Sequence, residues 1–174
     1  GRVTDYVENP EKTNGGDLVT AYQCNPSIAD QEFLFSKRQY AAITGRERKD
    51  NNVIAYHLRQ SFKPGEITPE LALEIATEFA KEHLPGYETV IGVHVDKEHI
   101  HAHLVFNSVN ADTGEKYHSN AQSYYQQIRA TSDRLCREHG LSVIMEGESA
   151  QAVSYIEWLR QSKGQPTFRS MLEA

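Results

Sequence analysis

A dense group of histidines is the first chemically suggestive feature of this 174-residue chain, because four of its eight histidines fall between positions 94 and 103. Side chains alternate between the two faces of a strand, so His101 and His103 share one face and His94 shares a face with Asp96. In a hairpin with a turn of about two or four residues, His94 lies across from His101 or His103. Facing Cβ atoms are then about 5 Å apart, so we predict that the three imidazoles converge on one ion. The alternative is a histidine-rich surface hairpin.

Three neutral imidazoles that leave coordination positions open suit a Lewis-acid centre better than a closed structural site. Imidazole binds zinc, copper, nickel and iron and tolerates manganese, so the ligands alone do not select the ion. We expect Asp96 to accept the second N–H of a ligand histidine and to fix its tautomer. Asn107 either does the same or donates to a phosphate. His99 falls in the turn and is a candidate fourth ligand, a proton carrier or simply an exposed residue.

The charge of the chain is unevenly distributed. The net charge of -6 disfavours a nucleic-acid partner on average. Residues 36–63, however, hold seven basic and two acidic side chains, a net charge of +5 that leaves -11 for the remainder. This segment is able to bind an anion such as a phosphate backbone, unless it is only a solvated face. Its main candidates for phosphate contacts are Arg46, Arg48, Lys49 and Arg59.

Periodicity and helix breakers divide the chain into the elements that must position these groups. The strand predicted at 53–62 carries His57, Arg59 and Ser61 on one face. Together the patterns predict an α+β domain, a central antiparallel sheet flanked by helices. The expected strands are 18–23, 53–62, 89–95, 100–109 and 141–144; the expected helices are 3–9, from Ser27 or Asp30 to about 42, 69–84 capped by Thr68, 123–139 ended by Gly140, and 149–161.

Length and composition favour one soluble domain. Hydrophobic residues make up 39% and charged residues 24% of the chain, which argues against wholesale disorder and against a membrane protein. The sequence contains no apolar run of about 18 residues, so no membrane span is predicted. No signal peptide is evident at the N-terminus. Two cysteines make a poor disulfide framework, so a reducing cytoplasm is expected. We expect one catalytic domain over 1–174, with a core of about 1–145 and a helical extension at 146–174, and the initial Gly1 suggests a fragment.

Three segments resemble the motifs of relaxases, the strand-nicking nucleases of plasmid mobilisation. HVDKEHIHAHLVFN (94–107) resembles the third motif of the MOBP class, which belongs to the histidine–hydrophobic–histidine (HUH) endonucleases. DYVENPEKT (5–13) resembles the first motif, with its tyrosine on a helix, and AYHLRQSFKPGE (55–66) resembles the second. The motifs occur in the family's order. One departure is that the family usually has a strand before the tyrosine helix, whereas almost nothing precedes Val3.

The resemblance implies a mechanism and a set of partners. Tyr6 is then the nucleophile that leaves a 5′-phosphotyrosine and a free 3′-hydroxyl, and Ser61 touches the DNA. His94, His101 and His103 hold a divalent ion. Manganese or magnesium is the ion expected in the reaction, with zinc, nickel or cobalt as alternatives. Asp96, His99 or His57 is a candidate to deprotonate the tyrosine, and His57 either contacts a phosphate or is structural. The expected partners are single-stranded origin DNA, accessory relaxosome proteins and a coupling protein, with no membrane insertion and no small-molecule cofactor.

Other functions stay open at this point. A rolling-circle replication initiator or a transposase of the HUH type places its tyrosine downstream of the histidines, where Tyr124 and Tyr125 occur. A tri-histidine metallohydrolase of small esters is a second alternative. A metal-dependent DNA-binding module without catalysis is a third.

Overall fold

The computed structural model describes residues 3–45 and 53–143. Contacts group Gly1–Ser142 into one compact unit, separate from Val143–Ala174, and the fold below is that of the first unit. The helix predicted at 149–161 and the extension predicted at 146–174 lie outside the described residues. No helix in the described ranges is long and apolar enough to cross a membrane.

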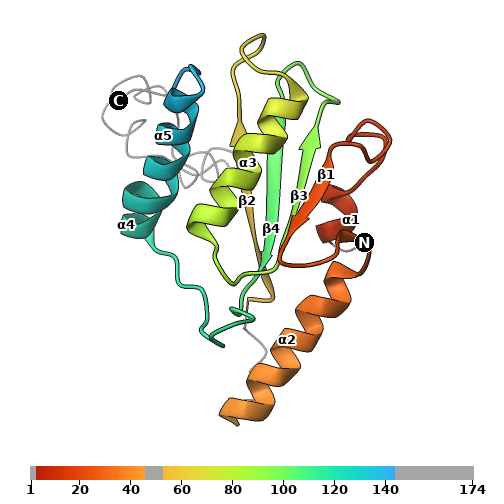
Figure 1. Cartoon of the computed structure of the whole chain (residues 1–174), viewed down its shortest axis with the longest axis vertical. Coiled ribbons are helices and arrows are strands. Elements are labelled where there is room, and N and C mark those ends of the chain that lie inside the picture. Colours follow the sequence, from red (N-terminus) through yellow and green to blue (C-terminus); the bar gives the residue numbers. More distant parts are fainter. Residues whose placement is uncertain (1–2, 46–52, 144–174) are drawn as a thin grey trace, which may run out of the picture. The chain divides into compact units, whose positions relative to one another are not determined.

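A four-stranded antiparallel sheet forms the centre of the unit, with strand order β1-β3-β4-β2 (Figure 1). The strands are β1 (Val19–Tyr22), β2 (Ala55–Ser61), β3 (Thr89–His94) and β4 (His101–Asn107). They coincide with four of the predicted strands, because each is a short run of β-branched, aromatic and alternating residues. The predicted α+β class is therefore confirmed.

The helices differ in how well their ends are marked in the sequence. They are α1 (Val3–Val7), α2 (Ala29–Thr44) after a 3-10 turn (Pro26–Ile28), α3 (Pro69–His83), and a continuous helical stretch of α4 (Ala121–Ser123), a π-helical segment (Tyr124–Arg129) and α5 (Ala130–Glu138). As predicted, Thr68 caps α3, accepting a hydrogen bond from the amide of Leu71 at 3.3 Å. Neither Ser27 nor Asp30 caps α2. Asn25 caps the 3-10 turn instead, accepting from the amide of Ser27.

The strand predicted at 141–144 is wrong for Leu141–Val143, which form no strand. Gly140 takes a left-handed conformation (φ 73°), as predicted for a residue that ends a helix. The amide of Leu141 then donates to the carbonyl of Cys136 at 2.8 Å. Because this closure of α5 occupies the Leu141 amide, that amide is not available to pair with a strand.

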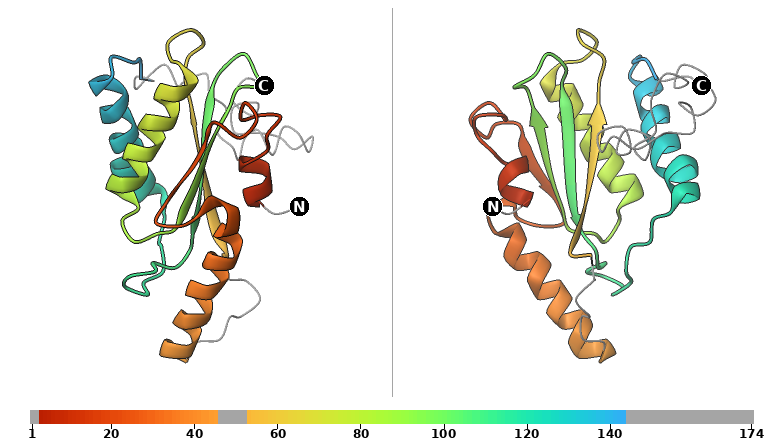
Figure 2. Two further views of the ribbon diagram at one scale, coloured as in Figure 1. Left: turned by 45° about the vertical axis from the view of Figure 1, so that its right-hand side comes forward. Right: turned by 180° about the vertical axis from the view of Figure 1, so that it is seen from behind.

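Helices cover both faces of the sheet. Figure 2 shows α3 and α5 on one side, with α1 and α2 on the other. α3 buries an apolar stripe that includes Ile75 and Phe79, and the stripe packs against the sheet face that carries Ile91 and Leu104. On the opposite face, α1 and α2 share a buried cluster with β3 and β4, made of Val7, Ala29, Phe33, Val90 and Val105. The histidines of β3 and β4 belong to this second face.

Candidate active site

The pairing of β3 with β4 sets the histidines against one another. His94 lies opposite His101, and Gly92 lies opposite His103. The ring centroids are 4.3 Å apart for His94 and His103, and 6.1 Å apart for His101 and His103. The three side chains are only 1%, 7% and 4% exposed in sequence order. One of the two predicted pairings is thus the observed one, although the connection, Val95 to Ile100, is longer than the turns we expected.

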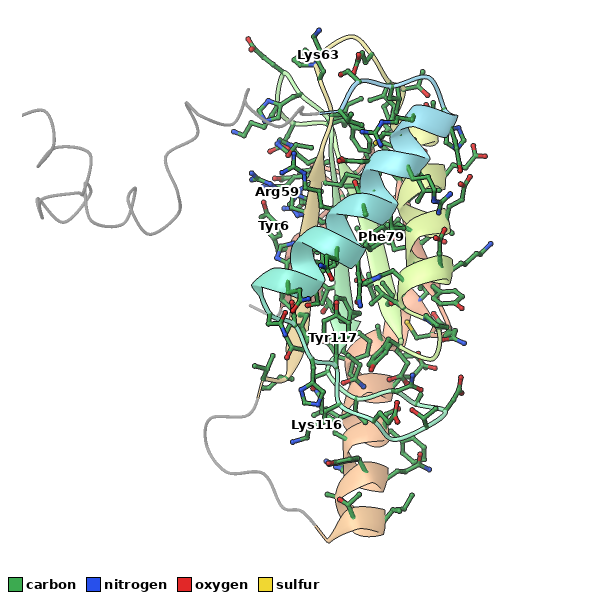
Figure 3. All side chains as sticks on the ribbon, turned by 90° about the vertical axis from the view of Figure 1, so that its left-hand side faces the viewer. Tyr6, Arg59, Lys63, Phe79, Lys116 and Tyr117 are labelled. Carbon is green, nitrogen blue, oxygen red and sulfur yellow. The ribbon has the colours of Figure 1, made fainter. Side chains whose placement is uncertain are left out.

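Tyr6 rests on this histidine cluster. Its ring stands edge-on to His94 and His103, with centroid distances of 5.0 and 5.5 Å. The side chain is 45% exposed, so the cluster covers one part of the ring and solvent reaches the rest. Figure 3 shows Tyr6 and Arg59 on the same side of the sheet, with Phe79 on the other. A helix at the start of the chain and a hairpin ninety residues later therefore form one site.

Hydrogen bonds to two of the histidine rings determine which nitrogens are free. A carbonyl can only accept, so His94 Nε2 donates to the Val7 carbonyl at 3.2 Å, and Nδ1 of the neutral ring keeps its lone pair. His103 Nδ1 lies 2.9 Å from His57 Nε2; when His103 donates in this contact, its Nε2 keeps the lone pair that a metal ion needs. Metal-ligating histidines commonly use one nitrogen for the ion and the other for such an outer contact.

The donor set fits a divalent ion by its chemistry, but its present arrangement is not that of a bound ion. Within the part of the chain that the structure describes, no three histidine, cysteine or carboxylate side chains are grouped closely enough to hold a metal. His94, His101 and His103 each lie on neighbouring strand positions of the same face. Ligation by all three therefore requires their rings to turn toward a common point.

The site lowers the pKa values of three of its imidazoles, those of His57, His101 and His103. The pKa of His103 is lowered to about 3, first by burial and then by the neighbouring His94, His57, His101 and Arg59. Burial also lowers the pKa values of His57 and His101. Neutral imidazole is the form that offers a lone pair to a metal ion or to a proton.

Asp96 makes a different contact from the one that we expected. β3 ends at His94, so Asp96 lies in the following loop and its carboxylate pairs with Lys12 Nζ at 3.6 Å rather than with a histidine ring. Partial desolvation acts to raise the pKa of Asp96, but the ammonium of Lys12 and other groups outweigh it, so the pKa is lowered. The same ammonium lies 4.5 Å from the centroid of the Tyr6 ring.

Lys12 is a site residue that the sequence reasoning missed. Its backbone carbonyl accepts from the amide of Val95 at 2.9 Å, which joins the loop after α1 to the loop after β3. The available signal was its place in DYVENPEKT, six residues after Tyr6. Its contact with Asp96 depends on the tertiary fold, and no spacing rule predicts it.

Strand β2 lines one side of the histidine cluster. Arg59 pairs with His103 and Ser61 pairs with His101 across the β2–β4 ladder. His57, Arg59 and Ser61 are all exposed. The other predicted phosphate contacts, Arg46, Arg48 and Lys49, lie outside the described residues.

The last two predicted residues, Asn107 and His99, lie in different surroundings, one buried and one exposed. Asn107 is completely buried and donates to Glu88 Oε2 at 2.8 Å and to the Phe33 carbonyl at 3.2 Å. Its amide therefore joins β4 to α2 inside the fold, away from any surface that DNA can reach. His99 is an exposed loop residue whose ring lies 4.1 Å from that of His101.

Comparison with known proteins gives one consistent family. The family described as "Relaxase: MobA/VirD2-like, nuclease domain" matches residues 6–141. Two proteins named "Protein rlx" from Staphylococcus aureus are 35% and 38% identical to the chain, over 84% and 82% of its length. The "Group II intron-interrupted relaxase LtrB" of Lactococcus lactis subsp. cremoris (strain MG1363) is 30% identical over 90% of the chain.

The chain spans only 42%, 40% and 34% of the length of these three relatives. No solved structure is significantly similar to it. The family match begins at Tyr6 and includes the whole histidine hairpin, so it covers the residues that build the site. By this match and these identities, the chain belongs to the MobA/VirD2-like relaxases and contains the nuclease domain of that family.

Proposed function

We propose that this chain nicks and rejoins one DNA strand at a transfer origin, with Tyr6 as the nucleophile. The observation that carries the proposal is the edge-on packing of the half-exposed Tyr6 ring on His94 and His103. A tyrosine that served only as a core anchor would be covered. This one instead leaves about half of its surface open beside a cluster of imidazoles.

The proposed reaction is a transesterification. The Tyr6 hydroxyl oxygen attacks the scissile phosphorus, a new O–P bond forms, and the P–O3′ bond breaks. The phenolic proton passes in net to the departing 3′ oxygen, which leaves a 5′-phosphotyrosine and a 3′-hydroxyl. Because the phosphodiester is exchanged rather than hydrolysed, the 3′-hydroxyl can attack the phosphotyrosine and restore the strand.

We assign His94, His101 and His103 to a divalent ion, with manganese or magnesium as the ion in use. When bound, the ion withdraws charge from the oxygens of the scissile phosphate. Relaxase nuclease domains generally use a divalent metal, which supports this assignment. Arg59 and Ser61 of β2, which are exposed and pair with His103 and His101, would hold the phosphate backbone of the strand, and the guanidinium would supply the charge.

His57 is the group that we favour as acceptor of the phenolic proton, over Asp96 and His99. Its ring centroid lies 6.4 Å from that of Tyr6. Partial desolvation lowers its pKa, which favours the neutral ring, and its Nε2 can accept the proton once its contact with His103 Nδ1 is broken. Asp96 is engaged by Lys12, and His99 lies in the loop beyond His101.

The proposed partners follow from the reaction. Single-stranded origin DNA is the substrate, and accessory relaxosome proteins and a coupling protein are the expected partners in the cytoplasm. Tyr6 is a better nucleophile candidate than Tyr124 and Tyr125 of the π-helical segment. That segment leads into α5, which packs on α3 and therefore on the sheet face opposite the histidines.

The decisive experiment looks for a denaturant-resistant adduct between the protein and single-stranded origin DNA in the presence of manganese. The wild-type chain is expected to form it, and Tyr6→Phe is expected to lose it while retaining DNA binding and folding. Tyr22→Phe on β1 is the matched control and is expected to behave as wild type.

An adduct that survives in Tyr6→Phe but disappears in the double variant Tyr124→Phe/Tyr125→Phe would identify a replication-initiator type of enzyme. Hydrolysis of a soluble ester that none of these changes affects would identify a small-molecule hydrolase. DNA binding by the wild-type chain without either activity would identify a binding module.

A further inference from the structure

The end of the tyrosine helix rests directly on the backbone of β3 at Gly92. A Cβ atom added at Gly92 would lie 2.2 Å from the carbonyl oxygen of Val7 and 2.9 Å from Val7 Cγ1. Gly92 has ordinary strand pairing, opposite Val19 on one side and His103 on the other. The glycine is therefore required for space and not for an unusual backbone conformation. Any other residue must push α1 away from the sheet.

The same carbonyl holds a histidine. Val7 is the last residue of α1, where backbone carbonyls lack partners within their helix. The Val7 carbonyl accepts the hydrogen bond from His94 Nε2 at 3.2 Å, and Val7 is fully buried. A carbonyl acceptor behind a metal-ligating imidazole fixes both its tautomer and its ring orientation.

Tyr6 is coupled to this contact through the helix. Tyr6 precedes Val7 in α1, and its ring stands 5.0 Å from that of His94. Relieving a contact of 2.2 Å to an ordinary one requires α1 to retreat by roughly 1 Å, a displacement that can cost about 100-fold in rate in a well-aligned active site. The retreat would move the nucleophile and release His94 at the same time.

We propose that Gly92 is a positioning residue of the nicking reaction: its bare backbone sets the height of α1 above the sheet, so that one contact aligns the Tyr6 nucleophile and fixes the tautomer of His94. This inference rests on the proposed function of Tyr6. It adds that the nucleophile and the histidine are aligned by one shared contact rather than separately. It also assigns a role to a glycine that lies outside the three motif segments.

The test compares Gly92→Ala with Val93→Ala. Val93 is the next residue of β3, is fully buried, and lies on the opposite face toward α3, so its truncation weakens the same strand without touching α1. Three properties are measured for both variants: single-turnover cleavage of origin DNA, DNA affinity by anisotropy without metal, and the imidazole ¹⁵N spectrum of the metal-free chain.

For Gly92→Ala we expect cleavage to fall about 100-fold, DNA affinity to stay within about 2-fold, and the hydrogen-bonded Nε2–H signal of His94 to be lost. Val93→Ala should keep the His94 Nε2–H signal and most of the cleavage rate, even if it lowers the melting temperature as much as Gly92→Ala does. If Gly92→Ala fails to fold, the double variant Gly92→Ala/Val7→Ala replaces it. Removing Val7 Cγ1 relieves the 2.9 Å contact there, but the clash with the carbonyl remains.

Two results overturn the inference. One is a folded Gly92→Ala chain that cleaves DNA like the wild type. The other is a loss of cleavage in Val93→Ala as large as in Gly92→Ala. Failure of the proposed function is a separate outcome, because then the wild-type chain itself forms no adduct. In that case only the His94 spectrum tests whether Gly92 sets the contact between Val7 and His94. An unchanged Nε2–H signal in Gly92→Ala rejects that contact.

Discussion

Lys12 carries the only cation placed over the Tyr6 ring among the cation–ring contacts of the described residues. In the proposed reaction, attack by Tyr6 brings a negatively charged phosphate to a point beside this ammonium, which lies 3.6 Å from the carboxylate of Asp96. We predict that Lys12→Met, which keeps the length of the chain and removes the charge, slows single-turnover cleavage about 10-fold, the scale of a single charge-assisted contact, and changes DNA affinity little.

Lys12→Arg is the control, since arginine also packs over aromatic rings and pairs with carboxylates. Its cleavage rate should recover most of the loss. Equal cleavage rates for Lys12→Met and the wild type would show that the ammonium charge does not contribute to cleavage. Equal losses in both variants would show that the amine geometry, and not the charge, is what matters.

The proposed metal ligands allow a second prediction at this scale. His101→Ala or His103→Ala should abolish both manganese binding, measured by calorimetry, and cleavage, because the remaining two imidazoles supply too few donors. His118→Ala is the matched control, since His118 is exposed and lies on the loop after β4. Undiminished ion binding and cleavage in the double variant His101→Ala/His103→Ala would reject the assignment.

At the residue scale, alternation predicted most of the site. It placed His94, His101 and His103 on one face and His57, Arg59 and Ser61 on one face of the neighbouring strand, because side-chain direction in a strand is a local property. The Lys12–Asp96 pair and the Val7–His94 hydrogen bond join residues more than eighty positions apart. Such contacts depend on how α1 docks, and no local pattern carries that information. Asn107 shared the correct face but faces α2 and not solvent.

At the scale of elements, periodicity and capping predicted the framework. α3 shows why: Thr68, Pro69 and a regular apolar stripe are local signals that agree with one another. Ser123–His139 was predicted as one helix and is helical as far as Glu138, but its first part is π-helical. The length of the β3–β4 connection was also mispredicted, because Val95 bonds to the Lys12 carbonyl and leaves the ladder early.

Strand β2 and the basic segment around it yield a prediction about DNA. Arg59 is exposed beside His103, and each phosphate contact on a single strand contributes about 0.7 to the slope of log affinity against log salt. Arg59→Ala should reduce that slope by about 0.7, measured by anisotropy at several salt concentrations. Charge reversal at Arg46, Arg48 and Lys49 together should reduce both slope and affinity further. Unchanged slopes would mean that residues 36–63 form a solvated face.

At the scale of the whole molecule, the buried histidines link folding to pH. The folded chain holds the pKa of His103 at about 3, whereas an unfolded histidine has a pKa of about 6.5. Between these values the unfolded state binds a proton that the folded state refuses, so the free energy of unfolding falls as the pH drops below 6.5. His57 and His101, whose pKa values are also lowered, act in the same direction.

One carboxylate opposes this trend. Burial raises the pKa of Glu8, and the nearby Asp30 and Asp5 raise it further. Folding is therefore favoured slightly when Glu8 is protonated, so acid partly offsets the histidine effect. One fully withheld proton is worth about 1.4 kcal/mol per pH unit, which is the upper bound on the contribution of His103 to the slope.

We predict that the metal-free chain, unfolded with urea in the presence of a chelator, loses stability steadily from pH 7 to pH 5. His103→Gln keeps a polar side chain that can still reach His57 but cannot take up a proton. Its stability should fall less steeply over the same range, whatever its value at pH 7, because the proton released by folding is gone. The chelator is required because a bound ion would compete with protons for the same nitrogens and steepen the wild-type slope. A wild-type stability that is flat or rises toward pH 5, or equal slopes for the two chains, would mean that the histidine cluster is not held neutral by the fold.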